Sequence, residues 1–267
     1  WFLHEYSGGK WQLLGQLFSR KGTYEGKAAR SAYPNQFRYD SEYRLHITWC
    51  WREAGSNLLG NHDLASAYSE DFARTWKSDR GENLQLPISI GTPNHVVHPV
   101  KYHWGLMNTT TQCVDEEGRV HVVSWQNPDD APNPTTDFNQ FRYYHYWREA
   151  AGKWHKRLLP FHGRKPQAVI DAEGTMYVVF GTGDELNYHG KDAGTHLTIA
   201  WSTEKSGWTD WKTQRFVPGR KFIGEPLLDH DRWRENNVLS IYFQEAPEKP
   251  GAGSPLHVLE FSTSPAK

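Results

Sequence analysis

The sequence predicts an all-β fold, because short apolar runs separated by turn residues recur along it and no segment has long helical periodicity. A turn of the form Asp-x-Glu-Gly leads into an apolar strand at 115–118 and again at 171–174. Strands that end in an aromatic residue followed by serine recur at 67–69, 200–202 and 260–262. Repeats of about 40 to 50 residues with four strands each are typical of a β-propeller.

Composition narrows the class of protein. The 267 residues include 13 Trp and 13 Tyr and carry a formal net charge of −1. No run of about 18 apolar residues occurs, so no transmembrane helix is predicted. A near-neutral charge gives no sign of a nucleic-acid or membrane partner. The two cysteines, Cys50 and Cys113, do not form a disulfide framework, and both are expected to be buried free thiols.

The first complete repeat is expected over residues 33–76, with β-branched and aromatic residues in its strands. Its first strand is short and ends at Asp40, and its fourth strand begins near Trp76. Its second and third strands are Leu45–Trp49 and Leu64–Ser69. In the later repeats the expected second strands are Val120–Val123, Met176–Phe180 and Leu239–Phe243, and a divergent third strand is Tyr144–Trp147. Further fourth strands are expected near Trp11, Trp154 and Trp211.

Residues 1–20 have the pattern of a third and a fourth strand, and Leu256–Ser262 has that of a third. The sequence is therefore expected to hold half a blade, three full blades and most of another, about four to five blades. Residues 1–267 are expected to form a single β-propeller domain. Because a propeller needs at least four blades to close, we expect N-terminal blades to be lacking. The alternative is that the two terminal segments combine to close a small ring.

Strand order within a blade predicts which loops share a face. Turns between first and second strands, and between third and fourth strands, lie on one face. Loops between second and third strands, and links between blades, lie on the other. The second set is longer and richer in polar residues, and loops on a rigid scaffold are where function concentrates.

The turn from Ser69 to Trp76 resembles the Asp-box of bacterial neuraminidase repeats, Ser-x-Asp-x-Gly-x-Thr-Trp, with Ala73 where glycine is usual. Asp71 is expected to accept backbone N–H bonds within a tight turn, and Trp76 to pack between sheets. Residues 202–211 form a degenerate copy without the aspartate. These turns indicate the fold and say little about a reaction.

A wider resemblance covers most of the chain. Tyr33–Phe37, Leu45–Trp49, Asn61–Leu64 and the Asp-box turn, in this order, resemble BNR-4 repeat proteins, a family that includes the propeller-type ulvan lyases. The resemblance implies a seven-bladed propeller secreted by bacteria that degrade algal polysaccharide. It also implies β-elimination at the uronic acid residues of ulvan, a sulfated polymer of rhamnose and glucuronic or iduronic acid.

Such a lyase must neutralise the C6 carboxylate, remove the C5 proton and protonate the departing oxygen. His62 and His103 match the family's catalytic histidine positions, and histidine suits proton transfer near neutral pH. Arg164 is the expected carboxylate neutraliser, because its fork fits a carboxylate bidentately. The substrate-binding residues are expected to be Asn61, Trp104, Asn108, Arg52, Tyr188 and Tyr33, and the last two are also candidates for a catalytic tyrosine. Which residue is the base and which the acid stays open.

Other interpretations remain open. His46 and His121 alternate within second strands, which is typical of packing residues, and Arg52–Glu53 and Arg148–Glu149 can be simple surface pairs. The elimination needs no cofactor, although a structural divalent cation, calcium or zinc, is compatible with the histidines. Two further function classes compete: a sialidase-like glycoside hydrolase and a noncatalytic carbohydrate-binding propeller. The partner expected for a lyase is an anionic polysaccharide, with no nucleic acid and no membrane. The protein is expected to be a secreted or periplasmic monomer.

Overall fold

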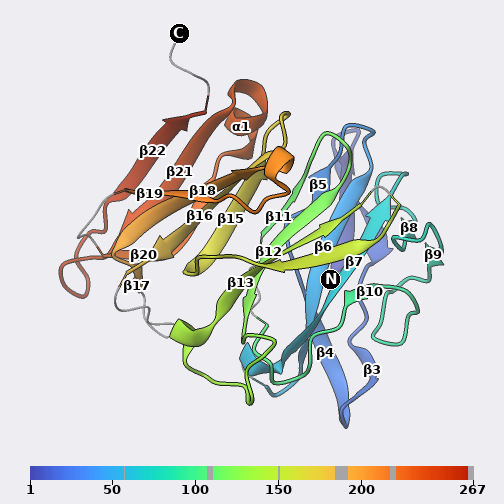
Figure 1. Ribbon diagram of the computed structural model, residues 1–267. Helices are drawn as coiled ribbons and strands as arrows, with labels where there is room; N and C mark the ends of the chain where they lie inside the picture. The colour runs from blue at the N-terminus through green and yellow to red at the C-terminus, as the bar shows by residue number, and fades with distance from the viewer. Residues whose placement is uncertain (57, 107–110, 150, 184–191, 217–220, 264–267) are drawn as a thin grey trace.

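The computed structural model is built of antiparallel strands, as the sequence predicts, with one short α-helix in the part of the chain that it describes. It describes residues 1–267 except 57, 107–110, 150, 184–191, 217–220 and 264–267, and only the backbone of 58, 138, 192 and 193. The sheets follow one another in chain order (Figure 1). In the described residues, no helix is long and apolar enough to cross a membrane.

The first repeat forms the largest sheet. Its strand order is β3 (Lys21–Tyr24), β4 (Lys27–Pro34), β6 (Leu45–Glu53), β7 (Asn61–Ser69), β8 (Trp76–Lys77) and β9 (Asn83–Leu84). Two short strands join it: β5 (Arg38–Tyr39) pairs with β6, and β10 (Val96–His98) pairs with β7. The expected first strand is therefore split, because β4 and β5 both pair with β6 around an irregular segment. Strands β3, β9 and β10 were not predicted.

The next two repeats are four-stranded sheets, as predicted. The second contains β11 (Thr111–Val114), β12 (Val120–Gln126), β13 (Arg142–Arg148) and β14 (Trp154–Leu158). The third contains β15 (Arg164–Ile170), β16 (Thr175–Thr182), β18 (His196–Thr203) and β19 (Lys212–Phe216). Short 3-10 turns occupy Leu58–Gly60, Phe138–Gln140 and Glu204–Ser206.

The last sheet differs from the prediction in two ways. It contains β17 (Asp192–Gly194), β20 (Phe222–Leu228), β21 (Val238–Glu245) and β22 (Leu256–Ser262). Strand β17 comes from the third repeat and pairs with β20. It is thus an additional edge strand of the last sheet, which the sequence did not indicate. The turn between β20 and β21 is the helix α1 (His230–Asn236), which Asp229 caps by accepting from the Arg232 N–H.

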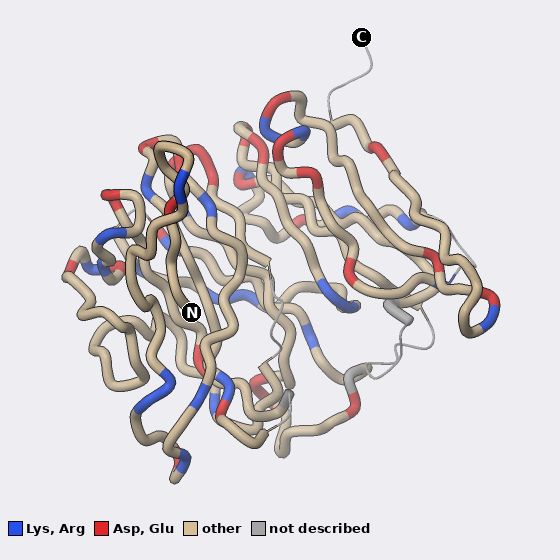
Figure 2. The backbone as a smooth tube through the Cα atoms, turned by 180° about the vertical axis from the view of Figure 1, so that it is seen from behind, with Lys and Arg blue, Asp and Glu red and all other residues tan. Residues whose placement is uncertain are grey.

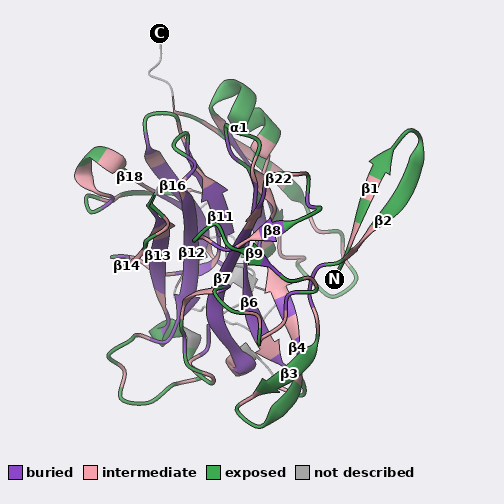
Figure 3. Cartoon of the chain, turned by 90° about the vertical axis from the view of Figure 1, so that its right-hand side faces the viewer, coloured by how far each residue is buried: buried purple, intermediate pink, exposed green. Residues whose placement is uncertain are grey.

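Strands β1 (Phe2–Ser7) and β2 (Lys10–Gln16) form a separate two-stranded hairpin, in agreement with the expected third and fourth strands. Figure 3 shows the hairpin standing away from the other sheets. Leu3 and Leu14 pack against the core of the first sheet, while Tyr6 and Trp11 are exposed. The number of blades in a complete ring stays a prediction.

The sheets pack face to face, so the middle strands are buried on both faces. All seven residues of β12 are buried, as the continuous purple in Figure 3 indicates. One core joins the second and third sheets and another joins the third and fourth. Large, fully buried side chains in these cores are Trp125, Phe141, Tyr143, Phe180 and Phe222.

Three aspartates hold the turns between first and second strands. Asp40, Asp115 and Asp171 each accept backbone N–H bonds from the residues two and four positions ahead, at 2.7 to 3.1 Å. In the first two repeats the carboxylate also meets a buried histidine six positions ahead. The Nε2 atoms of His46 and His121 lie 2.8 and 3.1 Å from their aspartates. These histidines are packing residues, as the sequence indicates.

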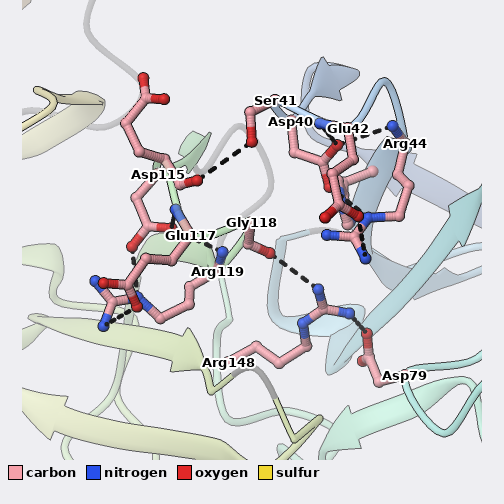
Figure 4. A network of polar contacts seen from close by, with 12 residues as sticks. Asp40, Ser41, Glu42, Arg44, Asp79, Asp115, Glu117, Gly118, Arg119 and Arg148 are labelled. Atoms are coloured by element: carbon pink, nitrogen blue, oxygen red, sulfur yellow. Dashed lines mark hydrogen bonds and ion pairs between the residues drawn. The ribbon is translucent and has the colours of Figure 1, made fainter.

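The turns of neighbouring sheets interlock at this end of the molecule (Figure 4). The Ser41 hydroxyl donates to the Glu116 carbonyl oxygen (3.2 Å). Arg148 donates to the Gly118 carbonyl oxygen (3.0 Å) and to Asp79 (2.9 Å). Arg148 is 7% exposed, so the alternative that Arg148 and Glu149 form a simple surface pair is wrong. The guanidinium instead joins the first sheet to the second.

The turn between Ser69 and Trp76 has the capping geometry that the sequence predicts. Asp71 accepts from the backbone N–H groups of Arg74 (3.1 Å) and Thr75 (2.8 Å) and from the Thr75 hydroxyl (2.6 Å). These bonds hold the pKa of Asp71 below its usual value even though its burial acts in the opposite direction. Trp76 has no exposed surface.

We predict that Asp71→Ala destabilises the protein by about 1 kcal/mol, the usual effect of a lost cap, without lowering any activity of the folded protein. Denaturant unfolding measures the change. Asp210→Ala, an exposed position in the degenerate copy of the turn, is the matched control and should change stability by less than ~0.5 kcal/mol. Equal effects of the two changes would contradict a capping role for Asp71.

We also predict that stability falls as the pH drops below about 6.5, the ordinary pKa of histidine. Burial lowers the pKa of His46, His121 and His145 in the folded state. The unfolded chain therefore takes up protons that the folded chain does not. The free energy of unfolding falls by up to ~1.4 kcal/mol per pH unit for each histidine. Urea unfolding between pH 7.5 and 5.5 measures this slope. His145→Gln should flatten it, whereas His4→Gln, at an exposed position, should leave it unchanged.

Candidate active site

Three of the predicted substrate-binding residues meet at the end of the first sheet opposite the Asp40 turn. Arg52, near the end of β6, donates from Nε to Asn61 Oδ1 (2.6 Å) and from Nη1 to the Tyr33 hydroxyl (3.0 Å). Its guanidinium also lies 4.0 Å from the centroid of the Tyr33 ring. Arg52 and Asn61 are direct partners in the β6–β7 register, so the strand pairing itself brings them together. The result is a half-buried cation that orients a phenol.

His62 follows Asn61 on β7 and has no exposed surface. Its Nδ1 is 2.9 Å from Asp63 Oδ2 and its Nε2 is 3.1 Å from Glu53 Oε1. The Tyr24 ring stacks on the imidazole at 3.9 Å, with the two planes 4° apart. Burial, and secondarily nearby carboxylates, raise the pKa of the Tyr24 hydroxyl to about 12, so this phenol stays protonated. Substrate reaches the imidazole only if these neighbours move.

The Glu53 carboxylate is the centre of this buried network. Arg30, which is fully buried, donates to it from Nε (2.7 Å) and from Nη2 (3.3 Å). Glu53 is 1% exposed, so the alternative that Arg52 and Glu53 form a simple surface pair is wrong. Local sequence patterns do not indicate Arg30 as its partner, because the two residues meet only through the register between β4 and β6.

The segment after β10 places His103 and Trp104 on the same side. His103 is exposed and its backbone has a φ of +66°, which is uncommon outside glycine and is enriched at functional sites. Its ring lies 3.8 Å from that of Tyr102, which in turn meets His62 edge-on at 6.3 Å. Trp104 is half-buried and, like Tyr33, packs against a small cluster that contains Cys50. Because part of its side chain is exposed, Trp104 can both pack in the core and bind a ligand.

Arg164 lies in another sheet, at the start of β15, and is 3% exposed. The strand comes unusually close to β16 there, because a Cβ on the preceding residue, Gly163, would lie 2.3 Å from the Gly181 carbonyl oxygen. Burial raises the pKa of the Tyr143 hydroxyl far above its usual value, and the charge of Arg164 acts to lower it. Tyr143 is thus a phenol near Arg164, and it was not identified as a candidate from the sequence.

The structure brings together most of the predicted residues that it describes. Tyr33, Arg52 and Asn61 are in direct contact, and Trp104 packs against the same small cluster of buried residues as Tyr33. His62 and His103 are linked through Tyr102. Asn108 and Tyr188 lie outside the described residues. The convergence of His62, His103 and Arg164 on one groove stays a prediction.

Two further candidate chemistries can be assessed. Among the residues with described positions, no three His, Cys, Asp or Glu side chains gather in a way that could hold a metal ion. Burial raises the pKa of both thiols, Cys50 and Cys113, to about 12, which makes them unreactive at neutral pH. Basic and acidic residues are intermixed over the backbone (Figure 2), so an anionic ligand would depend on local groups.

The sequence matches a known repeat family. Residues 1–161, more than half of the chain, match the sequence profile of the BNR repeat-containing family. The chain belongs to this family. No curated protein sequence matches this BNR repeat protein closely enough to count as a relative.

Solved structures similar to this BNR repeat protein include carbohydrate-active enzymes. The polysaccharide lyase Uly1 superposes with a TM-score of 0.62 at 16% identity, over 97% of this chain and 52% of that one. An ulvan lyase of family PL25 gives a TM-score of 0.63 at 13% identity, over 97% and 58%. A NanB sialidase from Streptococcus pneumoniae gives 0.51 at 10% identity, over 94% and 33%. The chain thus spans just over half the length of the two lyases, and the likeness shows a shared fold.

We predict that Glu53→Gln destabilises the protein by about 3 kcal/mol, because it leaves the buried Arg30 without its counter-charge. Glu149→Gln is the matched control, since Arg148-Glu149 repeats the Arg52-Glu53 pattern but Glu149 is exposed. The control should cost no more than about 1 kcal/mol. Urea unfolding curves measure the stability of the two variants. Similar midpoints would show that the buried network contributes little to stability.

Proposed function

We propose that this chain is a secreted polysaccharide lyase that cleaves a uronic-acid-containing sulfated polysaccharide, of the ulvan type, by β-elimination. The observation that carries the proposal is the cluster of Tyr33, Arg52 and Asn61, together with the exposed His103, which Tyr102 links to His62, the residue after Asn61. It combines a phenol that a cation orients with a second proton-transfer group at the loop end of one sheet. Elimination beside a carboxylate needs two proton-transfer groups and a cation for the carboxylate, and we assign that cation to Arg164.

Each residue has a proposed role. His103 transfers a proton to or from the sugar, because its ring is exposed and histidine titrates near neutral pH. Arg164 neutralises the C6 carboxylate, whose charge increases as the C5 proton leaves. Tyr33 is the second proton-transfer candidate, and Arg52 and Asn61 hold it in place. His62 keeps its place in the proposal as a positioning residue, since carboxylates engage both of its ring nitrogens.

The comparisons favour a lyase over a hydrolase. The lyases superpose better than the sialidase, with TM-scores of 0.62 and 0.63 against 0.51. One of the similar structures is an ulvan lyase bound to -[GlcA(1-4)Rha3S]-, which contains a glucuronic acid and a sulfated rhamnose. A polymer of this kind is too large to enter a cell, which is why we propose that the protein acts after secretion.

We predict that the protein raises the ultraviolet absorbance of an ulvan solution, because elimination creates a double bond conjugated with the carboxylate. His103→Asn should lower the rate by ~10²-fold or more, the usual scale for a general acid or base. Asparagine also tolerates the left-handed backbone at this position, so the fold should be kept. Arg164→Ala should lower kcat at least as much as it raises KM.

The control is His257→Asn, on β22 of the last sheet, which should keep the parent rate. New reducing ends without absorbance would show hydrolysis and refute the lyase. Binding of ulvan without either product would show a carbohydrate-binding protein. A folded His103→Asn variant with the parent rate would remove His103 from the mechanism.

A further inference from the structure

An open pocket lies at the edge of the first sheet, beside β3. Its volume is about 330 Å³, at the lower end of the range for small-molecule sites. One wall is formed by residues 19–22, and the other by residues 85–92, which follow β9. Neither wall contains a residue of the candidate active site, so the pocket is a separate feature of the molecule.

The backbone holds the two walls in place. Phe18 and Ile88, both buried, form a parallel bridge, and the Ser19 N–H donates to the Ile88 carbonyl oxygen (2.8 Å). Gly22 has a φ of +124°, and a Cβ on it would lie 2.5 Å from the Ile90 side chain. Only glycine therefore permits this close approach of β3 to the second wall. The pocket is preformed, which lowers the entropic cost of binding a ligand.

The described side chains that line the pocket offer hydrogen-bond donors and one positive charge, and none of them is acidic. Lys21 is exposed, and its ammonium has no ion pair or hydrogen bond with any described residue. The Gln85 amide on the opposite wall is equally without a partner in the described part of the chain. The Ser19 hydroxyl accepts from the Lys21 N–H (3.1 Å), which leaves its own proton free to be donated. The pocket is therefore suited to an anion that accepts hydrogen bonds.

The arrangement of these donors favours a sulfate group over a carboxylate. A carboxylate is planar and is matched best by the fork of an arginine, whereas an ammonium is a compact charge with three donors that can turn. The oxygens of a sulfate group point in several directions, so donors from two walls can reach it. Lys21 and Ser19 lie on one wall and Gln85 on the other. The polysaccharide proposed as substrate carries sulfate groups of this kind.

We propose that this pocket binds the sulfate group of a sulfated sugar in the polysaccharide chain, outside the pair of sugars whose bond is cleaved. Strand β3 leads from Lys21 to Tyr24, which stacks on His62. A strand rises about 3.3 Å per residue, so Lys21 lies about 10 Å along β3 from this neighbour of the candidate active site. One polymer chain can therefore reach both places. The inference rests on the proposed function for the polymer and names the substituent that a second subsite recognises.

The decisive variant is Lys21→Gln, which removes the charge from an exposed side chain and should leave the melting temperature unchanged. Binding is measured by calorimetric titration with an ulvan hexasaccharide and with the same sugar after desulfation. Both titrations use the His103→Asn background, in which cleavage should not consume the sugar. Lys21→Gln should weaken binding of the sulfated sugar about tenfold, the effect of losing a hydrogen bond to a charged group. It should leave binding of the desulfated sugar unaltered.

The matched control is Lys27→Gln. Lys21 and Lys27 are both exposed, and their carbonyl oxygens accept from the buried Arg30 guanidinium (3.3 and 3.2 Å). Lys27 is not among the described residues that line the pocket, so this change should leave binding of both sugars unaltered. Gln85→Ala, on the opposite wall, should weaken binding of the sulfated sugar as Lys21→Gln does. Equal losses in Lys21→Gln and Lys27→Gln, or equal losses for the two sugars, would overturn the inference.

The possible outcomes separate this inference from the proposed function. If the parent protein cleaves ulvan and Lys21→Gln keeps the preference for the sulfated sugar, the pocket is not a sulfate subsite and the lyase stands. If the parent binds ulvan without cleaving it, the lyase is wrong, and a preference for the sulfated sugar that Lys21→Gln removes still supports the subsite. A parent protein that neither binds nor cleaves refutes both.

Discussion

The fold depends on the carboxylate of an aspartate at the entry to the second strand in each of the first three complete repeats. Asp40, Asp115 and Asp171 close the same turn by accepting the same two backbone N–H bonds. In two repeats the same carboxylate satisfies a histidine inside the sheet stack, where an unpaired polar group would be costly. One acidic side chain therefore fixes the turn, the register of two strands and the buried polar group between sheets. Function can then vary at the opposite end without disturbing this frame.

The fold could be predicted because its signals are local. The Asp turns, the aromatic-serine strands and the Trp at each fourth strand recur within single repeats, and the strands confirm them. The signals fail where pairing is long-range or depends on a few residues. Strand β17 is three residues long and pairs with the next sheet, and α1 replaces an Asp turn by using Asp229 as a helix cap. No periodicity could indicate either element.

The candidate site could be predicted only in part, for a related reason. Arg52 and Asn61 flank one loop, so their meeting follows from strand pairing. The partner of Glu53 is Arg30, 23 positions earlier. Arg52-Glu53 and Arg148-Glu149 look alike in sequence, yet one glutamate is buried and the other exposed. Burial depends on which strand lies alongside, and that is a property of the assembled sheets.

The burial of Cys50 and Cys113 gives the chain a practical property. Both thiols lie in the interior and remain protonated at neutral pH, because burial raises the pKa of each to about 12. A maleimide or a similar thiol reagent should therefore not react with the native protein. A single cysteine introduced at an exposed position, such as Lys101 beside His103, would be the one reactive group. A fluorophore attached there would test the proposed sugar binding at the loop end of the first sheet without removal of the native cysteines.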